Sequence, residues 1–564
     1  MKKELSMEQR LLIAFLLMGL VLFVTPYFYK PAPAPPQNKP AAAAAPPAPK
    51  SAPAENNPTA KAQAAAAPAK QMEMPGQVAA DKEETITVET DLYRVVFSNR
   101  GAVARSWILK AYKDHLGKPL DLVNQKALST VPAPFSLVFK GQAPQTDPNG
   151  ALFRMEHSPD NLILTFEFSD GRALTKKSFS FSRKSYLVDI TSQVTQNGVL
   201  LPHLLTWRGG FGDSTVLNPA SAQHTLYYDL AAGKLTEKEV KDAKNGPVAN
   251  SGQYSFAGLE DSFFAGVFLP GGHSSVELTT FSDPVPGEKG AEEQRIGAGV
   301  GGEGLNGFAL YVGPKDTELL QKVDPKLEQV VDWGWSGFIA KPLFLVLNWT
   351  AEHVAHNYGW AIVLVTIAIN TVLFPLKLSS MKSSKKMQAL QPQIAAINAK
   401  YKDLSLRDPR KAEQNQEMMD LYKKHGVNPV GGCLPMVLQL PFFFAFYKVL
   451  TVAIQMRGAS WLWVPDLSQP ETLSIRVLPV LLIVTQFLSQ KMTPSPGMDP
   501  AQQKMMLIMP LALGFMFYYQ SAGLVLYWLT GNLVGIAQQW LLNRSTPTPA
   551  VVDVKPVPKK KSRN

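Results

Sequence analysis

The feature that most constrains this chain is a group of apolar runs toward its C-terminus, each close to the length that crosses a lipid bilayer. The runs cover residues 358–377, 430–450, 474–490, 505–520 and 522–542, and a sixth covers 11–29 near the start. A helix needs about 20 apolar residues to cross roughly 30 Å of hydrocarbon. We therefore expect a multi-pass membrane protein with six transmembrane helices, of which the last five form an α-helical bundle over 358–542.

The distribution of charge predicts how these helices are oriented. The chain carries a formal net charge of +11, and its basic residues gather near the ends of the apolar runs. The segment 377–424 holds eleven basic and five acidic residues, a net charge of +6, and the tail 543–564 is also basic. Because basic loops are retained in the cytoplasm, we expect both segments and both chain termini to lie there.

The N-terminal region is expected to anchor and extend the chain. Lys2, Lys3 and Arg10 precede the first apolar run, which favours an uncleaved transmembrane anchor over residues 1–30. A cleaved signal peptide is the alternative, but residues 24–27 lack small side chains at the usual cleavage spacing. Residues 31–83 are rich in Ala and Pro, a composition that predicts a semi-rigid tether rather than a packed domain.

Residues 84–325 have the pattern of a large antiparallel β domain. Polar and apolar residues alternate over 85–90 and 162–168, and Asn197-Gly198 is a typical hairpin turn. Such alternation predicts a β-sandwich that buries one face of each sheet. With a cytoplasmic N-terminus, this domain is expected on the periplasmic side.

Residues 333–356 are expected to form an amphipathic helix that lies in the membrane interface. Aromatic and aliphatic residues alternate there with Lys341, Glu352 and His353. An additional membrane span is the alternative, which Pro342 and the charged residues disfavour.

The motifs that are absent exclude several function classes. The sequence contains no nucleotide-binding loop, dinucleotide fingerprint or nucleophile elbow, so we expect neither an enzyme nor a cofactor. A single cysteine, Cys433, rules out an intrachain disulfide and a Cys/His metal framework, and we expect no metal. A small-molecule transporter remains an alternative, although no internal repeat or acidic relay is visible. A membrane-anchored periplasmic binding module is another.

Several uncharged polar residues lie inside the expected spans. Thr366 and Asn370 are four residues apart, on one face of the second span. The other spans contribute further residues of this kind: Gln439, Thr485, Gln486, Thr530, Asn532, Gln538 and Gln539. Polar groups in lipid need partners or water, so these side chains either join helices together or line a wet cavity.

The cytoplasmic segment 378–424 is expected to form a basic helical hairpin with apolar residues at helical spacing. Lys385, Lys386, Met387, Met418 and Met419 are its candidate contact residues. Lysines suit anionic lipid headgroups or ribosomal RNA, and methionines suit variable apolar partners. The alternative is that the methionines only pack the hairpin against itself.

Three motifs, in this order and spacing, resemble those of the YidC/Oxa/Alb family of membrane protein insertases. They are NPVGGCLP at 428–435 continuing to Pro441, DPAQQK at 499–504 followed by Met509-Pro510, and SAGLVLYW at 521–528 followed by Asn532-Leu533. The N-terminal anchor, the tether and the β domain match the Gram-negative form of the family. The resemblance therefore covers nearly the whole chain.

The resemblance implies a function, a location and partners. It implies a bacterial inner-membrane insertase and chaperone that uses no nucleotide, and a periplasmic domain with a β-super-sandwich fold. Polar parts of a nascent membrane protein would enter a groove open to cytoplasm and lipid, while an apolar segment slides past Leu434, Pro435 and Phe515. The implied partners are nascent integral membrane proteins, the Sec translocase with its accessory subunits, the ribosome and anionic lipids.

The expected groove departs from the family pattern at two positions. The groove residues are Thr366, Asn370, Lys377, Gln439, Trp528 and Asn532. The family usually has an arginine five residues before the second-span proline, here Pro375, and a tyrosine at the position of Trp528. Our hypothesis is that Asn370 supplies hydration and that Lys377, on the same helical face, supplies positive charge. An ordinary interfacial role for Lys377 is the alternative. A further lysine, Lys448, is expected to snorkel near the outer end of its span.

Overall fold

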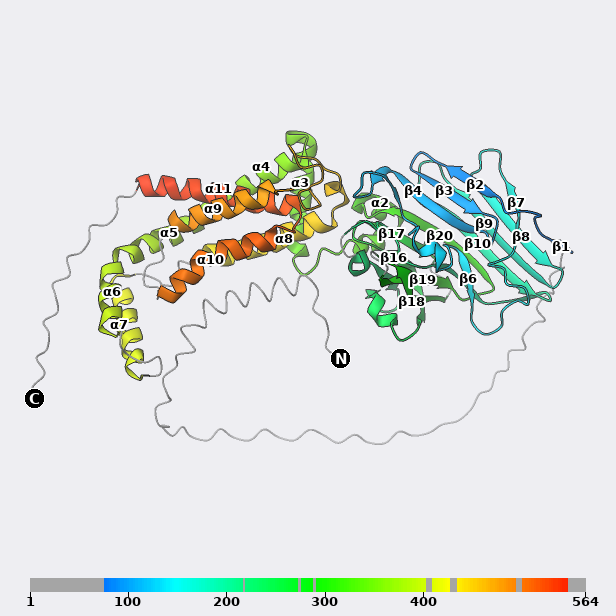
Figure 1. Ribbon diagram of the computed structural model, residues 1–564, viewed down its shortest axis with the longest axis horizontal. Helices are drawn as coiled ribbons and strands as arrows, with labels where there is room; N and C mark the ends of the chain where they lie inside the picture. Colours follow the sequence, from blue (N-terminus) through cyan, green and yellow to red (C-terminus); the bar gives the residue numbers. More distant parts are fainter. Residues whose placement is uncertain are drawn as a thin grey trace, which may run out of the picture.

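The computed structural model describes residues 76–216, 219–271, 275–287, 291–401, 408–426, 434–492 and 500–545. The expected anchor (1–30), most of the expected tether (31–83) and the tail beyond residue 545 lie outside these ranges. The described chain forms a large antiparallel β domain and a helical region, as expected from the sequence. The two parts lie at opposite ends of the molecule in Figure 1.

The β domain contains three antiparallel sheets, of eleven, five and four strands. The largest sheet comprises β1 (Gln77–Val78), β7 (Arg154–His157), β8 (Ile163–Asp170), β9 (Ala173–Phe181), β10 (Leu187–Gln196), β11 (Val199–Leu200), β13 (His224–Asp229), β14 (Lys234–Lys238), β16 (Tyr254–Glu260), β17 (Phe264–Leu269) and β20 (Leu305–Pro314). The second comprises β6 (Ser136–Phe139), β12 (His203–Trp207), β15 (Val248–Gly252), β18 (Val276–Pro286) and β19 (Glu292–Gly301). The third comprises β2 (Thr85–Glu89), β3 (Tyr93–Ser98), β4 (Val103–Lys113) and β5 (Pro119–Asp121).

Local sequence explains why these strands form. The alternation predicted over 85–90 appears in β2 as strictly alternating exposed and buried residues. Asn197 and Gly198 both adopt positive φ angles, 50° and 78°, and connect β10 to β11 in a two-residue turn. Positive φ at both central positions matches the right-handed twist of the flanking strands, which is why Asn-Gly is favoured there.

An aromatic cluster fills the core between the sheets. Phe179 lies 4.8 Å from Phe97 and 5.2 Å from Phe135, measured between ring centroids. Trp107 and Trp207 pack beside them at 6.1 Å from each other. Each fully buried aromatic side chain of this kind contributes about 1.5–3 kcal/mol of hydrophobic stabilisation.

The helical region begins after β20. Its helices are α2 (Thr317–Val323), α3 (Gly337–Thr350), α4 (Tyr358–Val372), α5 (Phe374–Ala389), α6 (Gln391–Lys400), α7 (Arg410–Lys424), α8 (Leu434–Val452), α9 (Val477–Met492), α10 (Pro500–Phe517) and α11 (Ala522–Ser545). The α6–α7 hairpin lies at the end of this region that is farther from the β domain (Figure 1).

Helix α3 occupies most of the segment expected to be an interfacial helix. Leu343 and Leu347 are buried, whereas Phe338 and Trp349 are exposed. A short π-helical turn follows, and His356 then adopts a positive φ angle of 50°. The helix therefore has one face covered by protein and another apolar face that the protein leaves open.

The run expected as a span over 358–377 is broken in the structure. Helix α4 ends at Val372 and α5 begins at Phe374, with a bend of 58° between them. Pro375 explains the break, because proline lacks an N–H and clashes with the preceding turn. By length and apolar composition, no single helix among the described residues qualifies as a membrane span, and only this bent pair does when taken together.

Candidate functional site

A line of polar side chains begins on α4 and is buried within the bundle. Thr366 and Asn370 are almost fully inaccessible. The Thr366 hydroxyl donates to the Ile362 carbonyl at 2.6 Å, and the Asn370 amide donates to the Thr366 carbonyl at 2.8 Å. These local bonds leave the Asn370 side-chain carbonyl free to accept from another helix or turn.

Lys377 supplies that donor. Its Nζ donates to Asn370 Oδ1 at 2.5 Å, and Gln538 of α11 donates to the Asn370 backbone carbonyl at 3.2 Å. The bend after α4 and the long lysine stem bring the amine directly onto Asn370. Residue spacing alone predicted a shared face but not this contact. Beside it, a Cβ placed on Gly531 would have only the Asn370 amide nitrogen near it, at 4.0 Å, so α11 leaves space next to the amide.

Asn532 belongs to a second polar group, between α11 and α9. Its side-chain amide donates to Gln486 Oε1 at 2.9 Å and lies 3.4 Å from the Thr485 hydroxyl. The structure therefore brings Asn532 to α9 rather than to Asn370.

Gln439 belongs to a third polar group, between α8 and α11. Its side chain donates to the hydroxyl of Tyr527 at 2.5 Å, and the buried Tyr527 ring stacks on Phe446 at 4.1 Å. Sequence reasoning did not single out Tyr527, although it lies in the 521–528 motif. All three polar groups share α11, which makes this helix the common wall of the candidate site.

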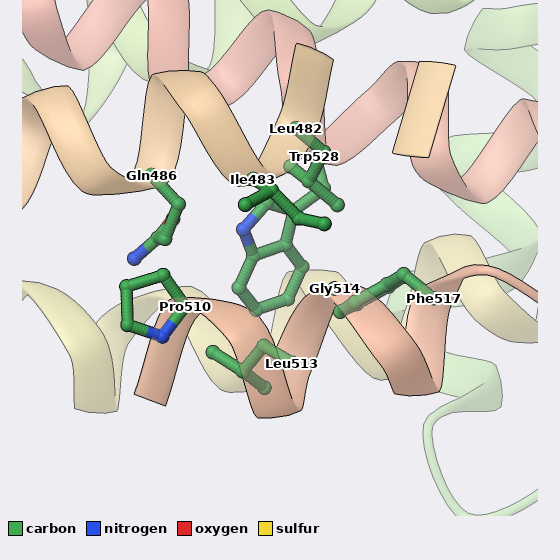
Figure 2. A pocket seen from close by; sticks show the side chains of 8 residues that line it. All are labelled: Leu482, Ile483, Gln486, Pro510, Leu513, Gly514, Phe517 and Trp528. Atoms are coloured by element: carbon green, nitrogen blue, oxygen red, sulfur yellow. The ribbon is translucent and has the colours of Figure 1, made fainter. Parts of the chain in front are cut away.

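Trp528 lies one helical turn before Asn532 on α11, and its ring enters an apolar region. Figure 2 shows its indole between α9 and α10, close to Gly514. The ring lies 4.9 Å from Phe443 and 5.1 Å from Phe517, both measured between centroids. The small cavity there is lined by Leu482, Ile483, Gln486, Pro510, Leu513, Gly514, Phe517 and Trp528.

The expected substrate-slide residues lie on α8 and α10. Helix α8 begins at Leu434, but the side chains of Leu434 and Pro435 fall outside the described ones. Phe515 is 71% exposed, and Ile508 and Leu511 on the same helix are also exposed. Positions 508, 511 and 515 share one helical face, so α10 presents an apolar stripe on its surface.

The expected hairpin contact residues divide into two sets. Met387 and Met418 pack against the small core of Leu390, Ile394 and Tyr422 that joins α6 and α7. Met419 and Lys386, in contrast, are exposed.

Lys385, on α5, makes a hydrogen bond that joins the base of the hairpin to the bundle. Its Nζ donates to the Leu542 carbonyl near the end of α11, at 2.9 Å. Helix α5, which leads into the α6–α7 hairpin, is therefore attached to the same helix that lines the polar groups.

One group of side chains in the β domain has the composition of a metal site. His224, Glu237 and Glu260 place ligand atoms within 4.8 Å of one another. Glu260 is also paired with Lys315, at 3.1 Å. Burial alone would lower the pKa of His224, but hydrogen bonding and attraction to Glu260 outweigh it and raise this pKa. A histidine that favours its protonated form beside a lysine-paired carboxylate fits an ion-pair network better than a ligand set. Sequence reasoning missed the group because the residues come from three strands.

Comparison with known proteins places both parts of the chain in one family. Residues 85–346 match the family described as the YidC periplasmic domain, and residues 349–549 match the family described as 60Kd inner membrane protein. The membrane protein insertase YidC of Ralstonia nicotianae is 35% identical over 483 residues, which cover 82% of this chain and 84% of that protein. The YidC of Geotalea daltonii is 32% identical over 570 residues, which cover 96% of this chain and 100% of that protein. A crystal structure of an active YidC insertase with its first transmembrane domain resolved is 18% identical, covers 82% of this chain and 94% of its own, and has a TM-score of 0.36.

Proposed function

This chain belongs to the YidC family of membrane protein insertases, and we propose that the polar groups on α4, α5, α8, α9 and α11 form its substrate groove. Insertase function in the inner membrane, without enzymatic chemistry, is what the curated relatives share over most of the chain. The groove would open to cytoplasm and lipid and receive the polar part of a nascent membrane protein.

The observation that carries the proposal is the hydrogen-bonded chain Thr366–Asn370–Lys377, in which Thr366 and Asn370 are buried and Lys377 is half-buried. Burying a polar group without partners costs about 2–7 kcal/mol, so an apolar bundle keeps such groups only where hydrogen bonds offset the cost. A lysine amine bound to a neutral amide holds positive charge close to Asn370. Asn370 and Lys377 together would do what a groove arginine does in most relatives: hydrate the site and attract acidic segments.

The apolar segment of the substrate would leave along α10. Ile508, Leu511 and Phe515 form an exposed stripe on that helix, and Leu434 and Pro435 start the neighbouring helix of the proposed slide. An apolar stripe of this kind in a membrane protein favours contact with acyl chains or another apolar helix. The polar part of a substrate would thus follow the polar groups along α11, and the apolar part would follow the exposed stripe of α10.

The ends of the bundle suit opposite sides of the membrane. The β domain and the α6–α7 hairpin lie at opposite ends of the helical region (Figure 1), and the hairpin side is strongly basic. We place the β domain in the periplasm, and the hairpin and both termini in the cytoplasm. Five core helices and the N-terminal anchor would make six spans. Exposed Lys386 and Met419 would then face cytoplasmic partners such as the ribosome or anionic lipids, and the Sec translocase would bind laterally.

Replacing Lys377 by alanine tests the groove proposal. We expect Lys377→Ala to slow the insertion of acidic-tailed substrates into proteoliposomes by on the order of tenfold, because about 1.4 kcal/mol of attraction corresponds to that factor. Neutral-tailed substrates should be inserted at the wild-type rate. Lys382→Ala, which removes an exposed lysine from the same helix, is the matched control and should have no effect on either. Equal rates for Lys377→Ala and wild type with acidic-tailed substrates would refute the role assigned to this lysine.

A further inference from the structure

The outer end of α8 and the turn that follows it contact the β domain and the segment that leaves it at three points. Lys448 Nζ lies 2.6 Å from Asp332 Oδ2, and the Gln455 amide donates to Asp316 Oδ2 at 3.1 Å. The third point is Arg457, which follows a short 3₁₀ turn at Ile454–Met456. Lys448, which was expected to snorkel near the outer end of its span, directs its amine to the segment that leaves the β domain.

Arg457 is inserted into the β domain. Its guanidinium forms an ion pair with Asp213, and the two side chains are only 4% and 1% exposed. The same Nη2 lies 2.9 Å from the carbonyl of Lys113, at the end of β4. The guanidinium also lies over Phe263 and Phe264, at 5.5 and 5.3 Å from their ring centroids. A residue of the helical region is therefore surrounded by three separate parts of the β domain.

We call the site formed by Asp213, the Lys113 carbonyl, Phe263 and Phe264 the arginine socket. Hydrogen bonds within the β domain hold this socket in place. Asp261 is buried and accepts from the backbone N–H groups of Asp213, Phe263 and Phe264 at 2.9, 2.8 and 2.7 Å. Gly212 adopts a φ of 86°, and a Cβ there would lie 1.9 Å from Asp261 Oδ2, so only glycine fits. These contacts fix the backbone at Asp213, from which its carboxylate reaches Arg457.

The electrostatics of the socket match the guanidinium. Burial alone would raise the pKa of Asp213, but the charge of Arg457 and the hydroxyl of Thr215 outweigh it and hold this pKa below its usual value. Asp213 is therefore ionised at neutral pH and supplies the charge that a buried arginine requires. Arginine suits such a site because its guanidinium stays charged when buried and stacks on aromatic faces such as those of Phe263 and Phe264.

We propose that Arg457 is a positioning residue that makes the outer end of α8 and the β domain move as one body. Helix α8 carries Gln439 of the groove and begins at the slide residues Leu434 and Pro435. With the outer end fixed in the socket, displacement of α8 during insertion is confined to its inner end, where substrate enters. This inference rests on the proposed groove function and assigns the β domain a mechanical part in it.

The proposed attachment of α8 to the β domain through Arg457, called the joint below, can be tested in the full-length protein in lipid nanodiscs. Spin labels at Ile163→Cys in the β domain and Val484→Cys on α9, in a Cys433→Ser background, report the distance between the two parts; both positions are exposed. We expect one narrow distance distribution for the parent protein and a clearly broader one for Arg457→Ala and for Asp213→Asn. The double variant should be no broader than either single variant, since both remove the same contact.

Arg476→Ala is the matched control. This arginine lies in the same outer region, and its guanidinium is bound by Tyr518 and Tyr519 of the helical part. It should leave the interdomain distribution unchanged. Arg457→Ala and Asp213→Asn should also slow insertion several-fold for acidic-tailed and neutral-tailed substrates alike, which separates this effect from that of Lys377→Ala.

Three results would overturn the joint. They are an unchanged distance distribution in Arg457→Ala, additive broadening in the double variant, and wild-type insertion rates despite a broadened distribution. In each case the groove proposal would stand or fall separately, on the response to Lys377→Ala.

Discussion

Gly514 is the position where the packing of α9 against α10 can be tested most directly. A Cβ added there would lie 2.1 Å from Cγ1 and 2.3 Å from Cδ1 of Ile483, whereas ordinary contact begins near 3.4 Å. Gly514→Ala therefore requires a displacement of about 1.3 Å. Ile483 cannot simply rotate away, because its β-branched side chain is restricted to one strongly preferred rotamer in a helix.

The expected cost follows from two opposing effects. Overpacking of a tight contact costs about 1–3 kcal/mol, and replacing glycine by alanine in a helix returns up to about 1 kcal/mol. We therefore expect Gly514→Ala to lower the free energy of unfolding by about 1 kcal/mol. Gly535→Ala on α11 is the control, because no heavy atom lies within 4 Å of its added Cβ, and it should be neutral or slightly stabilising.

A double-mutant cycle with Ile483→Ala isolates the contact. Ile483→Ala removes both atoms that a Cβ at position 514 would meet, so the two substitutions should be less harmful together than their sum by about 1–2 kcal/mol. Denaturant unfolding in detergent micelles, followed by the helical circular dichroism signal, measures all four proteins. Additive effects, or a Gly514→Ala variant as stable as Gly535→Ala, would refute this description of the α9–α10 contact.

Two further predictions concern buried polar side chains of the β domain. Burial lowers the pKa of His203 to about 4. Its ring is hydrogen-bonded to the Ser192 hydroxyl at 2.8 Å and to the Leu201 carbonyl at 2.9 Å. The unfolded chain takes up a proton between about pH 6.5 and 4 while the folded protein does not, so up to roughly 3 kcal/mol of stability should be lost as the pH falls through that window. Urea unfolding followed by tryptophan fluorescence should show this slope, and His203→Gln should flatten it; an equally steep slope in the variant would contradict the assignment. Lys177 donates to the carbonyls of Gly101 and Phe135, both at 2.7 Å, and Lys177→Met should lower the stability of the β domain by about 2–3 kcal/mol because these buried carbonyls lose their donor. An unchanged urea midpoint would show that the carbonyls find other partners.

Local periodicity explains what could be predicted from the sequence. The alternation in β2, the Asn-Gly turn after β10 and the shared face of Thr366 and Asn370 all depend on residues within a few positions of one another. The break before α5 had a visible signal in Pro375, although the apolar run around it suggested one continuous helix.

The contacts that could not be predicted join distant parts of the chain. Gln439 meets Tyr527 and Arg457 meets Asp213 only because whole helices and sheets are packed in a particular way. No pattern in one sequence specifies which polar residue of one helix faces which residue of another. For the same reason, the polar residues expected in the groove divide into three groups in the structure, and Trp528 packs among aromatic rings instead.

The neutral partner of Lys377 has a consequence for how often the proposed groove could be reused. Among the described residues, this lysine is held by an amide and by no carboxylate. If Lys377 attracts acidic segments as proposed, an arriving segment would compete with a weak resident partner and would not have to displace a strong one. Asn370 would take the amine back when the segment moves on. Rapid capture and rapid release, rather than tight retention, are what this arrangement favours in a protein that must handle one substrate after another.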